Sequence, residues 1–283
     1  MTRLPDCGWP IEGDFAALLD GDPVRLRSAL VWPLPPLSIG AGPEVVVTDR
    51  LGDEPAVIRP PSLVVGIGAV RDTPTGRILA MIDVALSEAD LAAGSVRALA
   101  TAEVKADDTG VATAARERNW PLIAYPAKVL ARIPVPNPSA YVAAAVGTPS
   151  VAEAAALIGR EAQLIVPKRH DGAVTVAVAR HAPRGRLTLL DRGWSPAGEL
   201  RRSSIVVCDG GHPLAAVHPA TRVVAGGAPD AVALARQGHA VALVCHGGHA
   251  GDRPAAEVAA LLSTSDSPAD REVDLTDCRP APR

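Results

Sequence analysis

Aromatic residues are scarce in this chain: its 283 residues include four Trp, two Tyr and one Phe. Its core must therefore be built from small aliphatic side chains, which favours helices and strands that pack closely. The formal net charge is −3, and no run of Lys or Arg occurs. Neither nucleic acid nor an anionic membrane surface is therefore favoured as a partner.

Long apolar runs are also missing. No window has the length and the lack of charge that a membrane span requires, and the first residues, Met1 to Asp6, lack the apolar core of a secretory signal. We therefore expect a cytoplasmic protein with no membrane-spanning segment.

Cysteine spacing gives no sign of a disulfide framework or a zinc knuckle, because the chain has no CxxC pair. The four cysteines are Cys7, Cys208, Cys245 and Cys278. Histidines and a cysteine within residues 239–249 form the only metal-like group, but Cys245 and His246 are neighbours that would point in opposite directions on a strand. We therefore expect no metal site.

Four segments of the chain differ in composition and in expected secondary structure. Residues 1–60 are rich in Pro, Gly and Asp, with one strand candidate at 45–48 and one helix candidate at 14–19, and indicate only a partial domain. Residues 61–182 alternate strands and helices. Residues 183–263 form a smaller α/β fragment, and the polar, proline-interrupted residues 264–283 are expected to be disordered.

The segment 61–182 predicts a three-layer α/β/α sandwich with a mainly parallel sheet, because its strands are separated by helices. The expected strands are 63–67, 96–104 and 121–125, with one helix from Pro74 to near Ser87, one from Val111 to Arg118, and more between 126 and 158. Strands at 164–166 and 174–178 flank Asp171-Gly172, a hairpin-turn signal. Strands at 187–190, 205–207 and 241–244, with helices at 229–237 and 254–262, make up the smaller fragment.

Polar groups follow several of these strands, and the carboxyl ends of parallel strands share one edge, where ligands bind. Gly66 and Gly68 end the first strand, where backbone amides could face an anionic ligand, although glycines needed only for a tight turn explain them as well. Residue 71 is Arg71 where the dinucleotide-binding motif needs glycine, so NAD is not expected.

Glu103 and Lys105 are the candidates for acid, base or charge chemistry. They alternate with Thr101 along the expected strand, and a carboxylate on an apolar strand is costly unless it is paired or used. A simple Glu103–Lys105 pair is the structural alternative. Asp107 follows as a binding candidate, although it or the adjacent Asp108 also fits a helix N-cap.

Ser150 and Glu153 fit a capping box, while Thr148-Pro149 fits a competing helix start two residues earlier. Either start leaves free backbone amides at the beginning of the helix, and Ser150 and Glu153 are binding candidates there. Structural capping alone explains these side chains as well. A Ser-His-Asp hydrolase is not expected, because the chain has no G-x-S-x-G turn.

Together these motifs resemble a known family. They are Gly66-Ile67-Gly68, the segment 100–108, Val135-Pro136-Asn137-Pro138-Ser139, the segment 147–157 and Leu164-Ile165-Val166-Pro167-Lys168. In this order they are similar to the C-terminal domain shared by CbiG and CobE, of the oxygen-independent and aerobic cobalamin pathways. The resemblance implies a cobalt-precorrin or precorrin as small-molecule partner, with other cobalamin-pathway enzymes as possible partners, and help in opening a ring-A lactone with release of acetaldehyde.

The resemblance leaves activity open, because the separate N-terminal domain that contributes to the family's chemistry has no counterpart here; a non-catalytic binding or carrier module is the alternative. Precorrins carry many carboxylates, so Arg71, Lys168 and Arg169, together with Lys105, become candidate cations, each with the alternative of a solvated surface charge. Cobalt is expected only as part of the substrate.

Weaker resemblances extend to both sides of this domain. Residues 1–60 are similar to the end of the family's central linker domain. Residues 183–263 are similar to the start of a tetrapyrrole methyltransferase, but they lack the glycine-rich turn after the first strand. The similarity makes a fused methyltransferase the third hypothesis. Because the glycine-rich turn is missing, S-adenosylmethionine is not an expected cofactor.

Overall fold

The computed structural model of this chain describes residues 9–28, 30, 37–139, 148, 150–159, 162–182, 185–191, 205–208, 222–237, 239–245, 253–263 and 273–277. The chain divides into two compact units. One unit, the middle unit, comprises residues 48–53 and 59–182. The other comprises residues 1–47, 54–58 and 183–283 and contains two separate sheets.

The middle unit is built on a five-stranded sheet with the order β7-β6-β5-β9-β8. Its strands are β5 (Leu63–Ala69), β6 (Val96–Ala102), β7 (Leu122–Tyr125), β8 (Gln163–His170) and β9 (Val174–Arg180). β5, β6 and β7 pair in parallel, and β9 pairs antiparallel with both β5 and β8. Four strands therefore run in one direction, and their carboxyl ends share one edge, as the sequence predicts.

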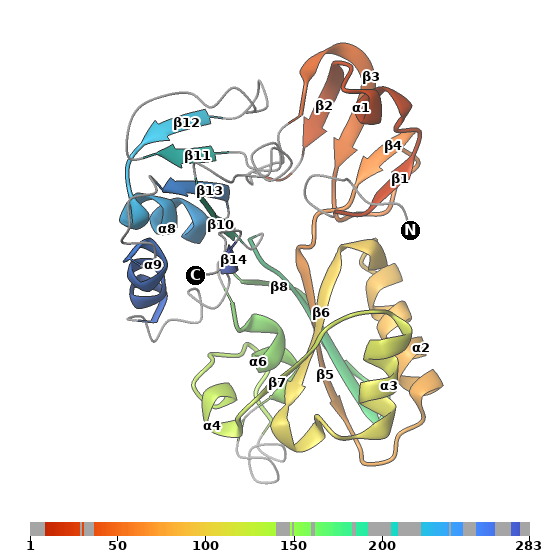
Figure 1. Cartoon of the computed structure of the whole chain (residues 1–283). Helices are drawn as coiled ribbons and strands as arrows, with labels where there is room; N and C mark the ends of the chain where they lie inside the picture. The colour runs from red at the N-terminus through yellow and green to blue at the C-terminus, as the bar shows by residue number, and fades with distance from the viewer. Residues whose placement is uncertain are drawn as a thin grey trace. The chain divides into compact units, whose positions relative to one another are not determined.

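Helices cover both faces of this sheet, which confirms the three-layer α/β/α prediction (Figure 1). On one face lie α2 (Thr75–Ser87) and α3 (Thr109–Glu117), and on the other lie α4 (Ala127–Leu130) and α6 (Val151–Leu157). Two short 3-10 turns, η1 (Ala93–Ser95) and η2 (Glu103–Lys105), flank β6.

Alternation along β5 explains the two layers, because neighbouring side chains of a strand point to opposite faces. Leu63, Val65 and Ile67 are fully buried in the cluster formed with α2 and α3. Val64 packs in the cluster formed with α4 and α6. A Cβ atom on Gly66 would overlap the Ala152 carbonyl oxygen, so this glycine permits α6 to lie directly on the sheet.

Two local signals are confirmed in this unit and one is shifted. The side chain of Asp108 caps α3 by accepting from the Gly110 N–H at 3.1 Å. The Asp171-Gly172 turn joins β8 to β9, with Gly172 at φ +95°. Helix α2, however, begins at Thr75, one residue later than predicted, and Pro74 occupies its N-cap position.

The N-terminal segment forms its own four-stranded sheet, with the order β1-β4-β3-β2. Its elements are β1 (Ile11–Gly13), α1 (Ala16–Asp20), β2 (Val24–Ser28), β3 (Ile39–Val47) and β4 (Ala56–Ile58). The sequence predicts only one of these strands, within β3, because the other three are only three to five residues long. Residues 48–53 belong to the middle unit, so the predicted boundary at residue 60 differs from the observed division.

The C-terminal segment forms a five-stranded parallel sheet with the order β12-β11-β13-β10-β14. Its elements are β10 (Gly185–Asp191), β11 (Ile205–Cys208), β12 (Arg222–Ala225), α8 (Ala228–Arg236), β13 (Ala240–Cys245), α9 (Arg253–Ser263) and β14 (Val273–Asp277). The small α/β fragment is thus present, and its resemblance to a methyltransferase stays a prediction. β14 lies in the segment predicted to be disordered; its Val-Asp-Leu-Thr-Asp pattern alternates as a strand requires.

Within the described parts of the chain, no helix combines the length and the apolar character needed to cross a membrane.

Candidate functional site

A cavity of about 480 Å³ lies at the edge of the middle unit's sheet where β5, β6 and β8 end. Its wall is completed by the start of β9, turn η2 and the first turn of α6. Its polar lining residues are Lys105, Ser139, Ser150, Lys168, His170 and Thr175. Carboxylates are absent from the described lining, so the charged side chains of this part of the wall are the two lysines.

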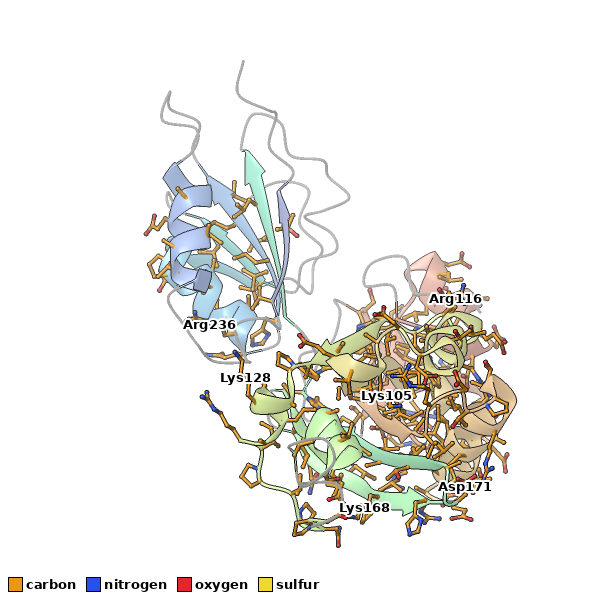
Figure 2. All side chains as sticks on the ribbon, turned by 90° about the horizontal axis from the view of Figure 1, so that it is seen from below. Lys105, Arg116, Lys128, Lys168, Asp171 and Arg236 are labelled. Atoms are coloured by element: carbon orange, nitrogen blue, oxygen red, sulfur yellow. The ribbon has the colours of Figure 1, made fainter. Side chains whose placement is uncertain are left out.

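Lys168 contributes one of the two lysine ammonium groups of the cavity from the end of β8 (Figure 2). Its Nζ atom donates a 2.6 Å hydrogen bond to the Asn137 carbonyl oxygen. That acceptor is neutral, so it does not neutralise the ammonium charge. The half-buried Lys168 side chain thus places a positive charge on the cavity wall.

Lys105 supplies the second ammonium group from turn η2, just before α3 (Figure 2). Its Nζ atom lies 3.9 Å from the Asp108 carboxylate, and its side chain is 23% exposed. Asp108 is already engaged with the Gly110 N–H as the cap of α3. The contact is therefore a long, partly exposed pair, which leaves Lys105 able to bind a further anion.

Glu153, in α6, is fully buried and accepts three hydrogen bonds. Its Oε1 accepts from Asn137 Nδ2 at 2.8 Å and from the Lys168 backbone N–H at 3.0 Å. Its Oε2 accepts from the Asn137 backbone N–H at 3.2 Å. A buried carboxylate is tolerated when it is hydrogen-bonded in this way. Glu153 therefore joins the loop at Asn137 and strand β8 to helix α6.

Ser150 caps α6 by accepting from the Glu153 N–H at 3.4 Å, so the helix starts at the later of the two predicted positions. The Glu153 side chain does not complete a capping box, because it bonds to Asn137 and Lys168 instead. Ser150 also lines the cavity, whereas Glu153 lies behind its wall.

The rim of the cavity is apolar. Val70, on the loop after β5, and Val104, in turn η2, line the cavity yet remain 58% and 68% exposed. Ala102, Val151 and Ala152 extend the apolar surface inward. A flat apolar ligand with anionic substituents would match this combination of exposed valines and lysines.

Of the ten residues predicted to form the site, four line the cavity: Gly68, Lys105, Ser150 and Lys168. The other six lie elsewhere: Gly66 and Glu153 are buried, Arg71, Glu103 and Asp107 are exposed on loops or turns, and Arg169 is half-buried on β8. The side chain of Arg169 pairs with Glu88, because it follows Lys168 on the strand and points to the opposite face.

The predicted alternation of Thr101, Glu103 and Lys105 along one strand is wrong. β6 ends at Ala102, and the next three residues form turn η2, so the period of two is broken. Thr101 is buried and donates to the Ile67 carbonyl at 2.8 Å. Glu103 is exposed and does not line the cavity, although it begins the turn that carries Lys105.

His170, Ser139 and Thr175 line the cavity but were not predicted from the sequence. His170 directly precedes the predicted Asp-Gly turn, and this position at the end of a strand was a usable signal. Ser139 ends one of the motifs that resemble the family, which was a usable signal as well. Thr175 carried no such signal, since nothing local distinguishes it from other surface hydroxyls.

Asp171 fastens the hairpin tip that forms one side of the cavity. Its carboxylate accepts a 2.7 Å hydrogen bond from Arg77 Nε of α2, and its second oxygen accepts from the backbone N–H groups of Val174 and Ala173. The Arg77 hydrogen bond first, and then the two backbone hydrogen bonds, hold the pKa of Asp171 well below its ordinary value.

No group of three or more His, Cys, Asp or Glu residues suited to a metal occurs among the residues with described positions. Of the metal-like group noted in the sequence, His246 and His249 lie outside the described residues.

Comparison with known proteins places residues 63–179 in the family described as Cobalamin synthesis G C-terminus. CobE from a Sinorhizobium species is 37% identical over 121 residues, which cover 41% of this chain and 79% of CobE. Cobalt-precorrin-5A hydrolase from Priestia megaterium is 33% identical over 122 residues, which cover 43% of this chain but only 33% of the hydrolase. A solved structure of CobE is 32% identical, with a TM-score of 0.38, over 42% of this chain and 89% of that chain.

Proposed function

The chain belongs to the cobalamin-synthesis family of CobE and the CbiG C-terminal domain, and we propose that its cavity binds a corrin-type intermediate with free carboxylate side arms. The observation that carries this proposal is that Lys105 and Lys168 share one cavity with the exposed side chains of Val70 and Val104. Lysine ammonium groups bind carboxylates, while an apolar rim contacts the flat face of a macrocycle.

Lactone opening with release of acetaldehyde is the second candidate activity, because the hydrolase from Priestia megaterium is among the relatives. The chain spans about a third of that enzyme, and the candidate acid or base Glu103 does not line the cavity. His170 is the side chain of the described lining that could move a proton. Because Glu103 is outside the described lining, we favour binding without turnover, and an acetaldehyde assay with a cobalt-precorrin tests the alternative.

Calorimetric titration with two corrinoids tests the binding proposal. Cobyrinic acid carries free carboxylates, whereas cobinamide carries amides at the corresponding positions. We expect cobyrinic acid to bind more tightly than cobinamide, because only its side arms can pair with the lysines. Lys168→Met and Lys105→Met should each weaken cobyrinic acid binding by about tenfold, since a hydrogen bond to a charged group is worth about 1.5–3 kcal/mol.

Two controls separate this result from a general effect on the fold. Arg169→Met removes a cation that pairs with Glu88 away from the cavity and should leave both affinities unchanged. Val104→Ser should weaken both corrinoids alike, because it alters the apolar rim, whereas Val84→Ser, at a 45% exposed position in α2, should weaken neither. Equal affinity of the wild-type protein for both corrinoids, or none for either, contradicts the proposal.

A further inference from the structure

We propose that Glu153 is a positioning residue that keeps the ammonium group of Lys168 available for a ligand carboxylate. This inference rests on the proposed corrinoid binding and assigns the cation that recognises a side arm. Glu153 lies behind the cavity wall, out of reach of a ligand in the cavity. Its role is exerted through Lys168 and Asn137.

Glu153 and Lys168 do not form the ion pair that their charges suggest. The Glu153 carboxylate accepts from the backbone N–H of Lys168 at 3.0 Å, and from the side-chain and backbone N–H groups of Asn137 at 2.8 and 3.2 Å. Three donors therefore satisfy this buried anion without the Lys168 ammonium group. The ammonium group is directed to the Asn137 carbonyl oxygen, at 2.6 Å.

A bulge in β8 frees the backbone N–H of Lys168 for Glu153. Val166 pairs with Val178 and Arg169 pairs with Val176, so β8 has one residue more than β9 between these two pairs. This bulge lies at Pro167-Lys168, on an edge strand of the sheet. Such bulges re-aim side chains and free backbone groups from the ladder. Here the freed N–H of Lys168 is the group that Glu153 binds.

The resulting Lys168 ammonium group suits a carboxylate ligand. It has three N–H donors, one of which is used by a neutral carbonyl, and no carboxylate pairs with it in the described part of the chain. A carboxylate is a stronger partner for an ammonium group than a neutral carbonyl, so a ligand side arm can take up the remaining donors or replace Asn137. A direct Glu153–Lys168 ion pair would have neutralised this charge.

Lys105 provides the internal comparison. It lines the same cavity and carries the same charge, but its contact is with Asp108, and the three donors to Glu153 come from Asn137 and Lys168 instead. A change at Glu153 that acts through Lys168 must therefore couple to Lys168 and not to Lys105. A change that merely loosens the fold would affect the contribution of both lysines.

Two double-mutant cycles with cobyrinic acid as the probe test this inference in the full chain. Glu153→Gln keeps the side-chain shape but turns an acceptor into a donor that faces one of the three N–H groups. We expect it to weaken binding by about three- to tenfold, within the loss that one hydrogen bond explains. Glu153→Gln/Lys168→Met should bind no more weakly than Lys168→Met alone, whereas Glu153→Gln and Lys105→Met should be additive.

Each outcome decides the matter. Equal coupling of Glu153→Gln to both lysines, or no loss of affinity with Glu153→Gln, overturns the positioning role while corrinoid binding by the wild-type protein stands. A wild-type protein that does not bind cobyrinic acid overturns both proposals. If Glu153→Gln fails to fold, Asn137→Ala replaces it, because it removes the 2.8 Å bond to Glu153 and keeps the carbonyl that Lys168 uses.

Discussion

Asp171 shows how one side chain shapes the cavity without entering it. Its neighbours His170, Gly172 and Ala173 all line the cavity, and its carboxylate joins this hairpin tip to Arg77 of α2. The pKa of Asp171 is lowered chiefly by the Arg77 hydrogen bond. Because the folded-state pKa lies below the unfolded one, the ionised carboxylate stabilises the folded protein above the unfolded pKa. That stabilisation is lost progressively as the pH falls from the unfolded-state pKa towards the folded-state pKa.

Asp171→Asn is therefore expected to lower the thermal midpoint at pH 7 and pH 5 by the same amount, and by less at pH 3.5, below the ordinary pKa of 3.8. Arg77→Met should reproduce this pH dependence, since it removes the main cause of the pKa shift. Thermal unfolding followed by circular dichroism at the three pH values measures the effect. A difference between wild type and Asp171→Asn that is as large at pH 3.5 as at pH 7 would count against this assignment.

Residues 153 and 168 mark the limit of what the sequence could predict. Both were selected as candidates, and Lys168 does line the cavity. The role of Glu153 depends on Asn137 and Lys168, which are 16 and 15 residues away along the chain. No local pattern encodes those contacts, because they arise only when α6, the loop at Asn137 and β8 pack together.

Helix α6 lies so close to β5 that residue 66 can have no side chain. A Cβ atom there would overlap the Ala152 carbonyl oxygen and lie 2.8 Å from the Ala156 nitrogen. Backbone atoms of a packed helix move aside at a higher cost than the end of a flexible side chain does. The position of α6, which places Ser150 and Val151 at the cavity, thus depends on Gly66.

Gly66→Ala is expected to destabilise the protein by about 2–3 kcal/mol through overpacking, and to weaken cobyrinic acid binding as α6 shifts. The matched control is Gly76→Ala in α2, where an added Cβ meets nothing within 4 Å. That change should stabilise the protein by about 0.4–1 kcal/mol, because alanine leaves the unfolded chain less conformational entropy than glycine does. Urea denaturation of both variants measures the free energies, and equal effects would contradict the packing argument.

The elements of the middle unit were predictable where a local pattern coincides with packing. The apolar run of β5, the Asp108 cap and the Asp-Gly turn each mark an element that the structure contains. The end of β6 was not predictable, because the strand-like composition continues through residues 96–105 and into turn η2. The short strands β1, β2 and β4 were missed, since each is held by its neighbours rather than by its own sequence.

Long-range contacts tie the first residues of the middle unit to its last strand. Asp49 is 1% exposed and accepts from Arg180 at 2.6 and 2.9 Å and from the Ser62 hydroxyl at 2.8 Å. Arg59, also buried, donates to the Thr48 carbonyl at 3.3 Å. These contacts explain why residues 48–53 belong with the sandwich rather than with the N-terminal sheet.

Asp49→Ala should destabilise the middle unit by about 3–5 kcal/mol, because it leaves the largely buried guanidinium of Arg180 without its carboxylate. Differential scanning calorimetry of the full chain should show a transition that moves to lower temperature in this variant and to higher temperature with cobyrinic acid, which stabilises the unit that binds it. The control variant Asp83→Ala removes an exposed ion pair with Arg118 and should change the transition temperature little. A similar loss in both variants would contradict the buried-pair argument.

The interleaved path of the chain has a consequence for synthesis on the ribosome. Residues 48–53 emerge before β4 completes the N-terminal sheet, yet Arg180 follows Asp49 by 131 residues. Asp49 therefore cannot gain its ionic partner until nearly all of the sandwich has been translated. The N-terminal sheet can close early in elongation, whereas the segment that links it to the sandwich must wait for strand β9.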